Sequence, residues 1–203
     1  MTRATLSLLL LLGAACGDRA RLWDAPLAVQ GPLKAGGQAF WVDSTRGTVF
    51  ALSPGSAGAP ATVAMRKVPR NASFVAPSPS GDLLLVLSAG KEAVYKDQAS
   101  EEPGLTVLRP VASAAPEVVR FYPLGRGLDR LAISADGTRA LAYTSGASGQ
   151  AGVFRNPNEI ALVDLGQPAG SENPLPRTVR SFGSAPIGVV FSPPMPIPAP
   201  GGP

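Results

Sequence analysis

The side chains of this sequence that could carry out chemistry are almost all carboxylates. The chain has 203 residues and no histidine, which excludes Ser-His-Asp and Cys-His catalysis, His-ligated zinc, copper or haem, and an imidazole base. It has one cysteine, which cannot form a CxxC metal or redox site. Acid/base catalysis or Ca²⁺ binding by Asp and Glu is the route that the residue types leave open.

These carboxylates lie where turns and strand ends are expected. Asp82 and Asp136 each stand beside a glycine in a short polar run, and such a pair favours a tight turn because the carboxylate accepts from backbone N–H groups while glycine adopts positive φ. Glu101 and Glu102 are interpreted as a solvated loop pair, and Asp43, Glu159 and Asp164 lie near strands. We therefore predict that Asp136 forms a turn, and we assign no catalytic, cofactor-binding or metal-binding residue.

Phosphate-bearing ligands have no recognisable motif in the sequence. Walker A and GxSxG patterns are absent, and "GRGLDR" departs from the dinucleotide pattern GxGxxG at Arg130. The formal net charge is +4, but no run of Lys or Arg exceeds two residues. We expect no cofactor and no nucleic-acid partner.

The N-terminus has the pattern of an export signal. "MTRATLSLLLLLGAACGD" places Arg3 before an apolar stretch of twelve residues. As a helix, such a stretch rises about 18 Å against a hydrocarbon core of about 30 Å, so it is too short to span a bilayer. Residues 1–15 are predicted to be a signal peptide, and the protein is predicted to be exported.

Cys16 follows small residues at the expected cleavage point. The run Leu12-Gly13-Ala14-Ala15-Cys16 resembles the lipobox of bacterial lipoproteins, although Gly13 stands where that family usually has Leu. The resemblance implies that Cys16 becomes the acylated N-terminus, anchored in the cell envelope at the periplasmic face or in the outer membrane. Acyl chains, palmitate among them, would contribute about 0.8 kcal/mol per buried methylene. The alternative is an ordinary secretory signal with an incidental cysteine.

The composition of the chain, which is 45% hydrophobic with 23 Gly and 22 Pro, favours many short strands joined by turns. Residues 39–53 predict a hairpin with its turn at 44–47. Further strands are predicted at 83–87, 104–110, 131–133, 139–143, 159–165 and 187–191. Five aromatic residues in these patterns are expected to pack in the core: Trp41, Phe50, Phe121, Tyr143 and Phe191.

The strand and turn pattern repeats along the chain. Ser78, Ser134 and Ser192 are 56 and 58 residues apart, and Phe40 and Leu84 are 44 apart. These intervals fit a four-stranded unit of about 40 to 50 residues that loop insertions lengthen. The segments "FVAPSPSGDLLLVLS", "LAISADGTRALAYTS" and "VVFSPP", with "NEIALVDL" between the last two, resemble the blades of bacterial β-propellers of the YVTN and WD40-like kind.

That resemblance implies an all-β, partial propeller-like array of about three four-stranded blades. Asp43 and Ser44 are aligned with the blade turn in the first copy. The division predicted is a signal peptide (1–15), a tether (16–34), repeats (35–192) and a disordered Pro-rich tail (193–203). Propellers close with about four to eight blades, so an open array would leave apolar faces exposed. Either further blades are missing, or this is a short protein with a flexible tail.

The function expected is binding or scaffolding at the envelope. Loops 90–104 and 144–158 are placed at one rim, where an envelope protein or a small ligand could dock. The resemblance also implies alternatives: a lactonase-like hydrolase or a quinoprotein-like oxidoreductase. A truncated gene product without its own function is the third reading.

Overall fold

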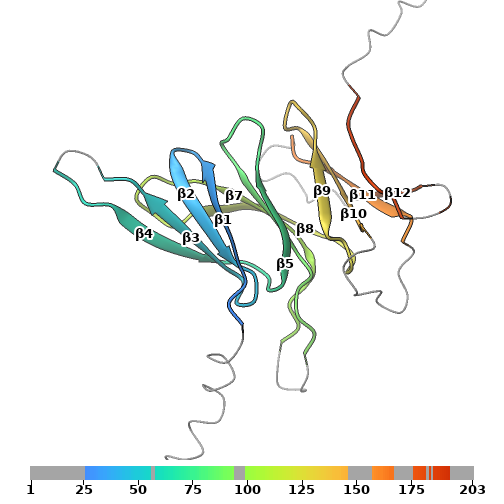
Figure 1. Ribbon diagram of the computed structural model, residues 1–203, viewed down its shortest axis with the longest axis horizontal. Helices are drawn as coiled ribbons and strands as arrows, with labels where there is room; N and C mark the ends of the chain where they lie inside the picture. Colours follow the sequence, from blue (N-terminus) through green and yellow to red (C-terminus); the bar gives the residue numbers. More distant parts are fainter. Residues whose placement is uncertain are drawn as a thin grey trace, which may run out of the picture.

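Twelve strands form three antiparallel sheets of four strands each, in which every strand pairs with its neighbour in sequence (Figure 1). The computed structural model describes residues 26–55, 58–93, 99–145, 157–166, 176–181, 183 and 185–192. Within these ranges there is no helix, and hence none long and apolar enough to cross a membrane. The fold is an all-β, propeller-like array of three four-stranded sheets, as the sequence predicts.

The first sheet contains β1 (Val29–Ala35), β2 (Gln38–Asp43), β3 (Thr48–Ser53) and β4 (Thr62–Lys67). The predicted hairpin is confirmed, but β1 begins inside the predicted tether, so the repeats start at Val29 and not at residue 35. The sequence signal for the β1–β2 hairpin is the pair Gly36-Gly37, which the interpretation of 16–34 as a tether overlooked and which has φ of 51° and 76°. Two consecutive positive φ values make the type I′ turn that matches strand twist, and they pair Ala35 with Gln38.

The second and third sheets repeat this order. The second contains β5 (Ala72–Pro77), β6 (Leu84–Ser88), β7 (Gly104–Arg109) and β8 (Glu117–Pro123); the third contains β9 (Arg130–Ile133), β10 (Arg139–Tyr143), β11 (Glu159–Asp164) and β12 (Arg177–Arg180). Turns 78–82 and 134–137 each join the first strand to the second, as predicted. The alignment of Asp43 and Ser44 with them is wrong, because turn 44–47 joins the second strand to the third.

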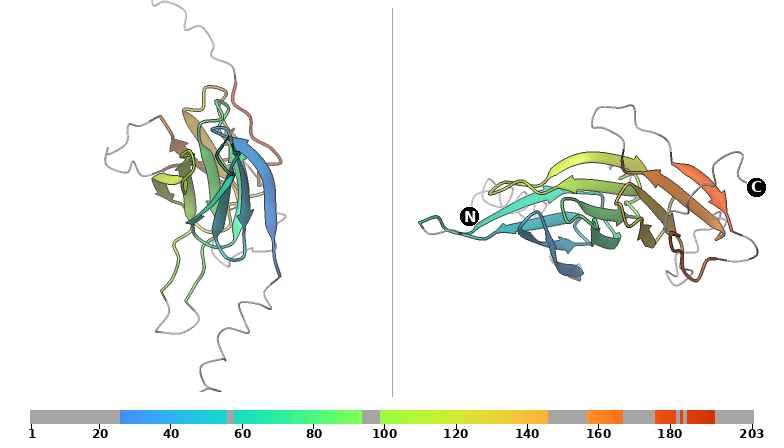
Figure 2. Two further views of the ribbon diagram at one scale, coloured as in Figure 1. Left: turned by 90° about the vertical axis from the view of Figure 1, so that its left-hand side faces the viewer. Right: turned by 90° about the horizontal axis from the view of Figure 1, so that it is seen from above.

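The sheets lie side by side in chain order, with β5 contacting β1 on one side and β9 on the other (Figure 2). We call the face that packs on the next sheet the front face and the opposite one the back face. The front of the first sheet, with Phe40 and Val42, packs on the back of the second, with Leu84 and Val86. Strand β6 is buried at all five positions because its sheet is covered on both faces.

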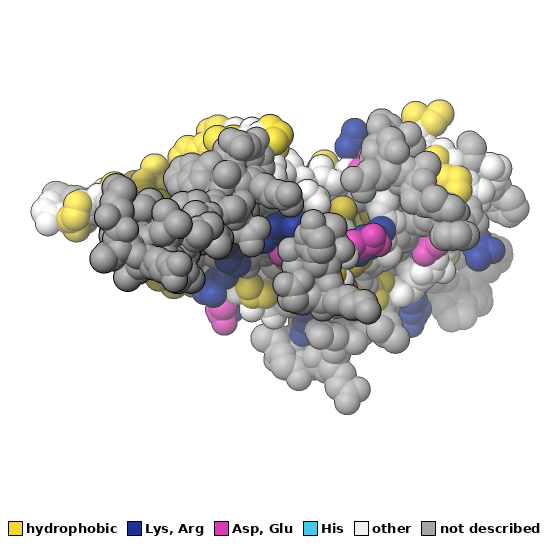
Figure 3. Space-filling model, turned by 90° about the horizontal axis from the view of Figure 1, so that it is seen from below, with side chains coloured by type: hydrophobic (Ala, Val, Ile, Leu, Met, Phe, Trp, Pro, Cys, Tyr) yellow, Lys and Arg dark blue, Asp and Glu magenta, His cyan; other side chains and the backbone are white. Residues whose placement is uncertain are grey.

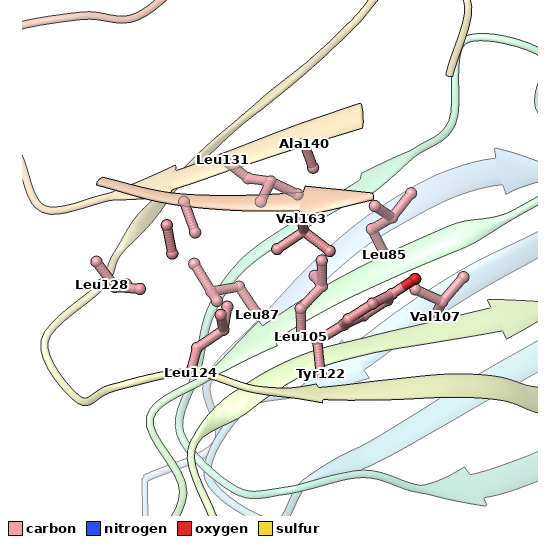
Figure 4. Packing of buried hydrophobic residues seen from close by; sticks show 12 residues of the cluster. Leu85, Leu87, Leu105, Val107, Tyr122, Leu124, Leu128, Leu131, Ala140 and Val163 are labelled. Atoms are coloured by element: carbon pink, nitrogen blue, oxygen red, sulfur yellow. The ribbon is translucent and has the colours of Figure 1, made fainter. Parts of the chain in front are cut away.

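A second core fills the space between the second and third sheets (Figure 4). Leu85, Leu105 and Tyr122 from the second sheet meet Ala140 and Val163 from the third. All five are almost fully buried, at 0 to 1% exposed. The two cores are therefore built alike, each from the front of one sheet and the back of the next.

The strand predicted at 187–191 is wrong. These residues form no strand, and Ile187 and Val190 are 103% and 90% exposed. A strand needs partners for its backbone groups, and no strand in the described ranges pairs with this segment. The predicted signal peptide, Cys16 and the Pro-rich tail 193–203 lie outside the described residues.

Candidate functional site

The turns between first and second strands meet along one edge of the array, at the top of Figure 1. The N–H of Gly36 donates to the carbonyl of Gly81 at 2.6 Å. A Cβ on Gly137 would lie 3.6 Å from Cδ of Pro79. This edge therefore brings together the turns that carry Asp82 and Asp136, the two carboxylates with the strongest repeat pattern.

In the second sheet, the turn 78–82 is held by its own side chains. The Ser78 hydroxyl donates to Asp82 Oδ1 at 2.8 Å and accepts from the N–H of Leu83 at 3.1 Å. Ser80 also donates to Asp82. The Ser80 and Ser78 hydroxyls stabilise the ionised carboxylate, so the pKa of Asp82 is lowered.

Asp136 has the same role in the third sheet. Its Oδ1 accepts from the Ser134 hydroxyl at 2.6 Å and from the N–H of Thr138 at 3.0 Å. These bonds, that of Ser134 foremost, lower the pKa of Asp136 to about 2. The prediction that Asp136 forms a turn is confirmed: its carboxylate is ionised and committed to its own loop.

The other predicted carboxylates are spread over the sheets. Asp43 is 2% exposed and pairs with Arg46 at 2.9 Å. Asp164 Oδ1 accepts from the N–H of Gly166. The interpretation of Glu101 as solvated is wrong, because it pairs with Arg70 at 3.1 Å, accepts from that residue's N–H and forms a backbone bridge with Lys91.

One buried carboxylate was missed. Asp129 is 7% exposed and accepts from both the N–H and the hydroxyl of Ser145, each at 2.7 Å. Its only sequence signal is its place between a Gly-rich loop and a short strand. Nowhere in the described ranges do three or more His, Cys, Asp or Glu residues gather so as to hold a metal.

The two loops expected at one rim both join second to third strands. The described start of loop 90–104 is tied to the second sheet, because the N–H of Gly90 donates to the carbonyl of Arg70. The start of loop 144–158 is tied by Ser145 to Asp129. Residues 94–98 and 146–156 lie outside the described residues, so only the loop bases are placed, at the edge opposite the turns.

The back face of the first sheet is an open apolar surface. Strand β4 alternates between exposed and half-buried positions, with Val63 and Met65 68% and 62% exposed. Register pairs Trp41 with Phe50 and Phe50 with Met65, which puts all three on this face. The prediction that Trp41 and Phe50 pack in the core is therefore wrong, whereas Tyr143 is buried as expected.

One hollow lies on this back face, and a second adjoins it at the edge of the sheet, where Leu33 pairs with the front-face residue Phe40. The first, of about 350 Å³, is lined only by apolar residues: Val29, Trp41, Phe50, Leu52 and Val63. The second, of about 340 Å³, shares Leu52 and is lined also by Leu33, Lys34 and Gln38. The first hollow lies on strand residues and is lined by no ionisable side chain, so it can bind apolar groups. The second reaches the Gly36-Gly37 turn and includes Lys34 in its lining.

The front face of the third sheet is also open. Register pairs Leu141 with Leu162 and Ile160 with Val179, on the side opposite the buried Ala140 and Val163. Val179 is 53% exposed, and the other three are half-buried. Seen from below, hydrophobic side chains are exposed towards both ends of the molecule (Figure 3).

Comparison with known proteins gives similarities to solved structures at low sequence identity. No protein-family model matches the sequence, and the curated proteins give no match. A candidate 6-phosphogluconolactonase of Bacteroides fragilis is similar over 80% of this chain and 40% of its own, at 14% identity and a TM-score of 0.49. The β-propeller domain of Cps50 (Swd1) from Myceliophteria thermophila is similar over 81% and 45%, at 15% identity and 0.49. The chain spans less than half of either structure.

Proposed function

We propose that this is a binding or scaffold protein of the bacterial cell envelope, held to a membrane by acyl chains on Cys16. The observation that carries the binding role is the open back face of the first sheet. One hollow lies on it and a second adjoins it, and Trp41 and Phe50 contribute large apolar rings to the first. Contiguous apolar patches of this kind on a soluble domain mark interaction surfaces.

A hydrolase is the weaker proposal on this geometry. The turn carboxylates are low-pKa groups that hold their loops, whereas a general base near neutral pH needs a raised pKa and a free lone pair. Lactone hydrolysis by the purified protein, with turnover that Asp136→Asn abolishes, would overturn the binding role in favour of the enzyme alternative.

The anchor is tested by labelling cells with a radioactive fatty acid. The wild type is expected to carry label and to sediment with membranes, whereas Cys16→Ser is expected to lose both properties because no thiol remains to be acylated. Equal labelling of the two chains would refute the anchor and leave the ordinary secretory signal.

The binding role is tested in cells with a photo-crosslinking amino acid at position 63. Val63 lies in the first hollow and is 68% exposed, so a discrete crosslinked product is expected. The matched control carries the same group at Glu117, an exposed position at the edge of the middle sheet. Absence of a product at position 63, or identical products at both positions, would contradict a docking role for this face.

A further inference from the structure

We propose that the partner of the open back face is a second copy of this chain, bound head to tail through the front face of its third sheet. The inference rests on the proposed binding function and names the occupant of that surface. Two copies would then form a closed ring of six sheets. The three sheets of one chain already pack on one another in this front-to-back manner.

Each contact inside the chain joins one front face to one back face. Phe40 and Val42 of the first sheet pack on Leu84 and Leu108 of the second. The next contact also joins a front face to a back face through apolar side chains, here Leu and Val on the front against Ala and Val on the back. In the described ranges these two contacts leave one back face and one front face uncovered, and faces of these two kinds pack on each other within the chain.

Hydrogen bonds at the margins fix how one sheet sits on the next. Arg66 Nε on β4 donates to the carbonyl of Pro116, next to β8, at 2.7 Å. The Tyr122 hydroxyl on β8 donates to the carbonyl of Asp164 at the end of β11, at 2.5 Å. The outer strand of one sheet therefore lies over the third or fourth strand of the next. By the same stacking, β12 of one copy would lie over β3 and β4 of the other.

The area available matches that of stable interfaces. With strands about 4.8 Å apart and a rise of about 3.3 Å per residue, the first sheet gives a face of about 400 Å² and the shorter strands of the third sheet give about 300 Å². A contact covers one face of each kind, and a closed pair has two contacts, so about 1,400 Å² is buried, within the usual range of a specific interface. The exposed side chains Val63, Met65 and Val179 would be covered.

Closure by two copies also explains why the contact would not continue into a filament. A head-to-tail contact forms a ring when its rotation closes and an open fibre when it does not. The three sheets that the structure describes in each copy give six in the pair, within the range of about four to eight at which sheets packed in this way close. In that ring the back face of the first sheet and the front face of the third sheet are both covered.

The test is the mass of the full chain purified in mild detergent, measured by sedimentation at about 10 μM, within the affinity range of interfaces this size. Two copies are expected, with a protein mass twice that of the single processed chain, which is 20.7 kDa before the predicted signal peptide is removed. Met65→Lys and Val179→Glu should each weaken association by about tenfold or more, since each buries an unpaired charge. Both residues are exposed in the single copy, and circular dichroism checks their folding. Val118→Lys, at a 41% exposed position on the middle sheet, is the matched control and should leave the pair intact.

Mixing the two variants decides the orientation. In a head-to-tail pair of one Met65→Lys chain and one Val179→Glu chain, one contact places the new Lys against the new Glu and the other contact has the wild-type residues. Association should therefore recover. A pair that survives Val179→Glu but not Met65→Lys would be symmetric back to back and would overturn the proposal. A single-copy mass at about 10 μM, or an open series of masses, would overturn it too.

Flotation of Cys16→Ser chains with phosphatidylethanolamine and phosphatidylglycerol vesicles, if it is lost in Met65→Lys, would assign the face to lipid instead. In each of these cases the fatty-acid label on Cys16 and the product at position 63 test the proposed function separately.

Discussion

Tyr122→Phe isolates one hydrogen bond between the second and third sheets. The Tyr122 side chain is 1% exposed, and its hydroxyl donates to the Asp164 carbonyl at 2.5 Å. Phenylalanine keeps the ring that packs against Leu105 and Val107 (Figure 4). Because Asp164 lies at an exposed strand end, water can reach its carbonyl, and the expected loss is about 1 kcal/mol. For a chain of this size, that corresponds to a melting temperature about 2 to 4 °C lower.

The pH dependence of this loss separates the hydroxyl from simple packing. Burial raises the pKa of Tyr122 above 10.0, with Arg120 acting in the opposite direction. The unfolded chain therefore releases the phenolic proton first, and wild-type stability falls as pH rises from 10 towards the folded-state pKa. Phe cannot titrate, and the other tyrosines are common to both proteins. The advantage of the wild type should thus shrink above pH 10.

The assay is urea unfolding of both proteins at one protein concentration, from pH 7 to pH 11. A Phe variant as stable as the wild type at pH 7 would show that the bond contributes nothing. Curves that stay parallel to pH 11 would refute the account of the raised pKa. A loss well above 3 kcal/mol would mean that the ring itself has shifted.

Three further predictions concern a turn glycine, a core leucine and the Asp136 carboxylate. Gly47→Ala should cost about 1 to 3 kcal/mol, because φ is 58° and the new Cβ would lie 2.3 Å from a carbonyl oxygen. Gly188→Ala, which has open space around it and no left-handed φ, should cost less than about 1 kcal/mol, and urea unfolding compares the two. Leu105→Ala in the core should cost about 2 to 5 kcal/mol, against about 0.5 kcal/mol or less for exposed Val63→Ala. The Asp136 carboxylate, with its pKa at about 2, stabilises the fold above pH 3.8 and loses this effect as the pH falls through 2. In Asp136→Asn the melting temperature should therefore fall less steeply between pH 4 and pH 2 than in the wild type. An equally steep fall in both proteins would contradict the turn contacts.

Local patterns predicted most of the strands and two of the blade turns. Asp136 and Asp82 were interpretable because their hydrogen bonds run to residues within a few positions along the chain. The Gly36-Gly37 turn is equally local and could have been recognised from its Gly-Gly pair. Asp129 and Glu101 could not, because their roles depend on Ser145 and Arg70, which only folding brings near.

The sequence by itself determined the all-β class, the repeat and the absence of imidazole chemistry, since each depends on residue types and short spacings. Only the tertiary structure decided which apolar faces are covered. Phe40 and Trp41 are neighbours in one strand with similar patterns, yet one is fully buried against the second sheet and the other lines an open hollow. Successive side chains point to opposite faces of a sheet. Whether a face meets another sheet depends on how the sheets stack, which no short stretch of sequence specifies.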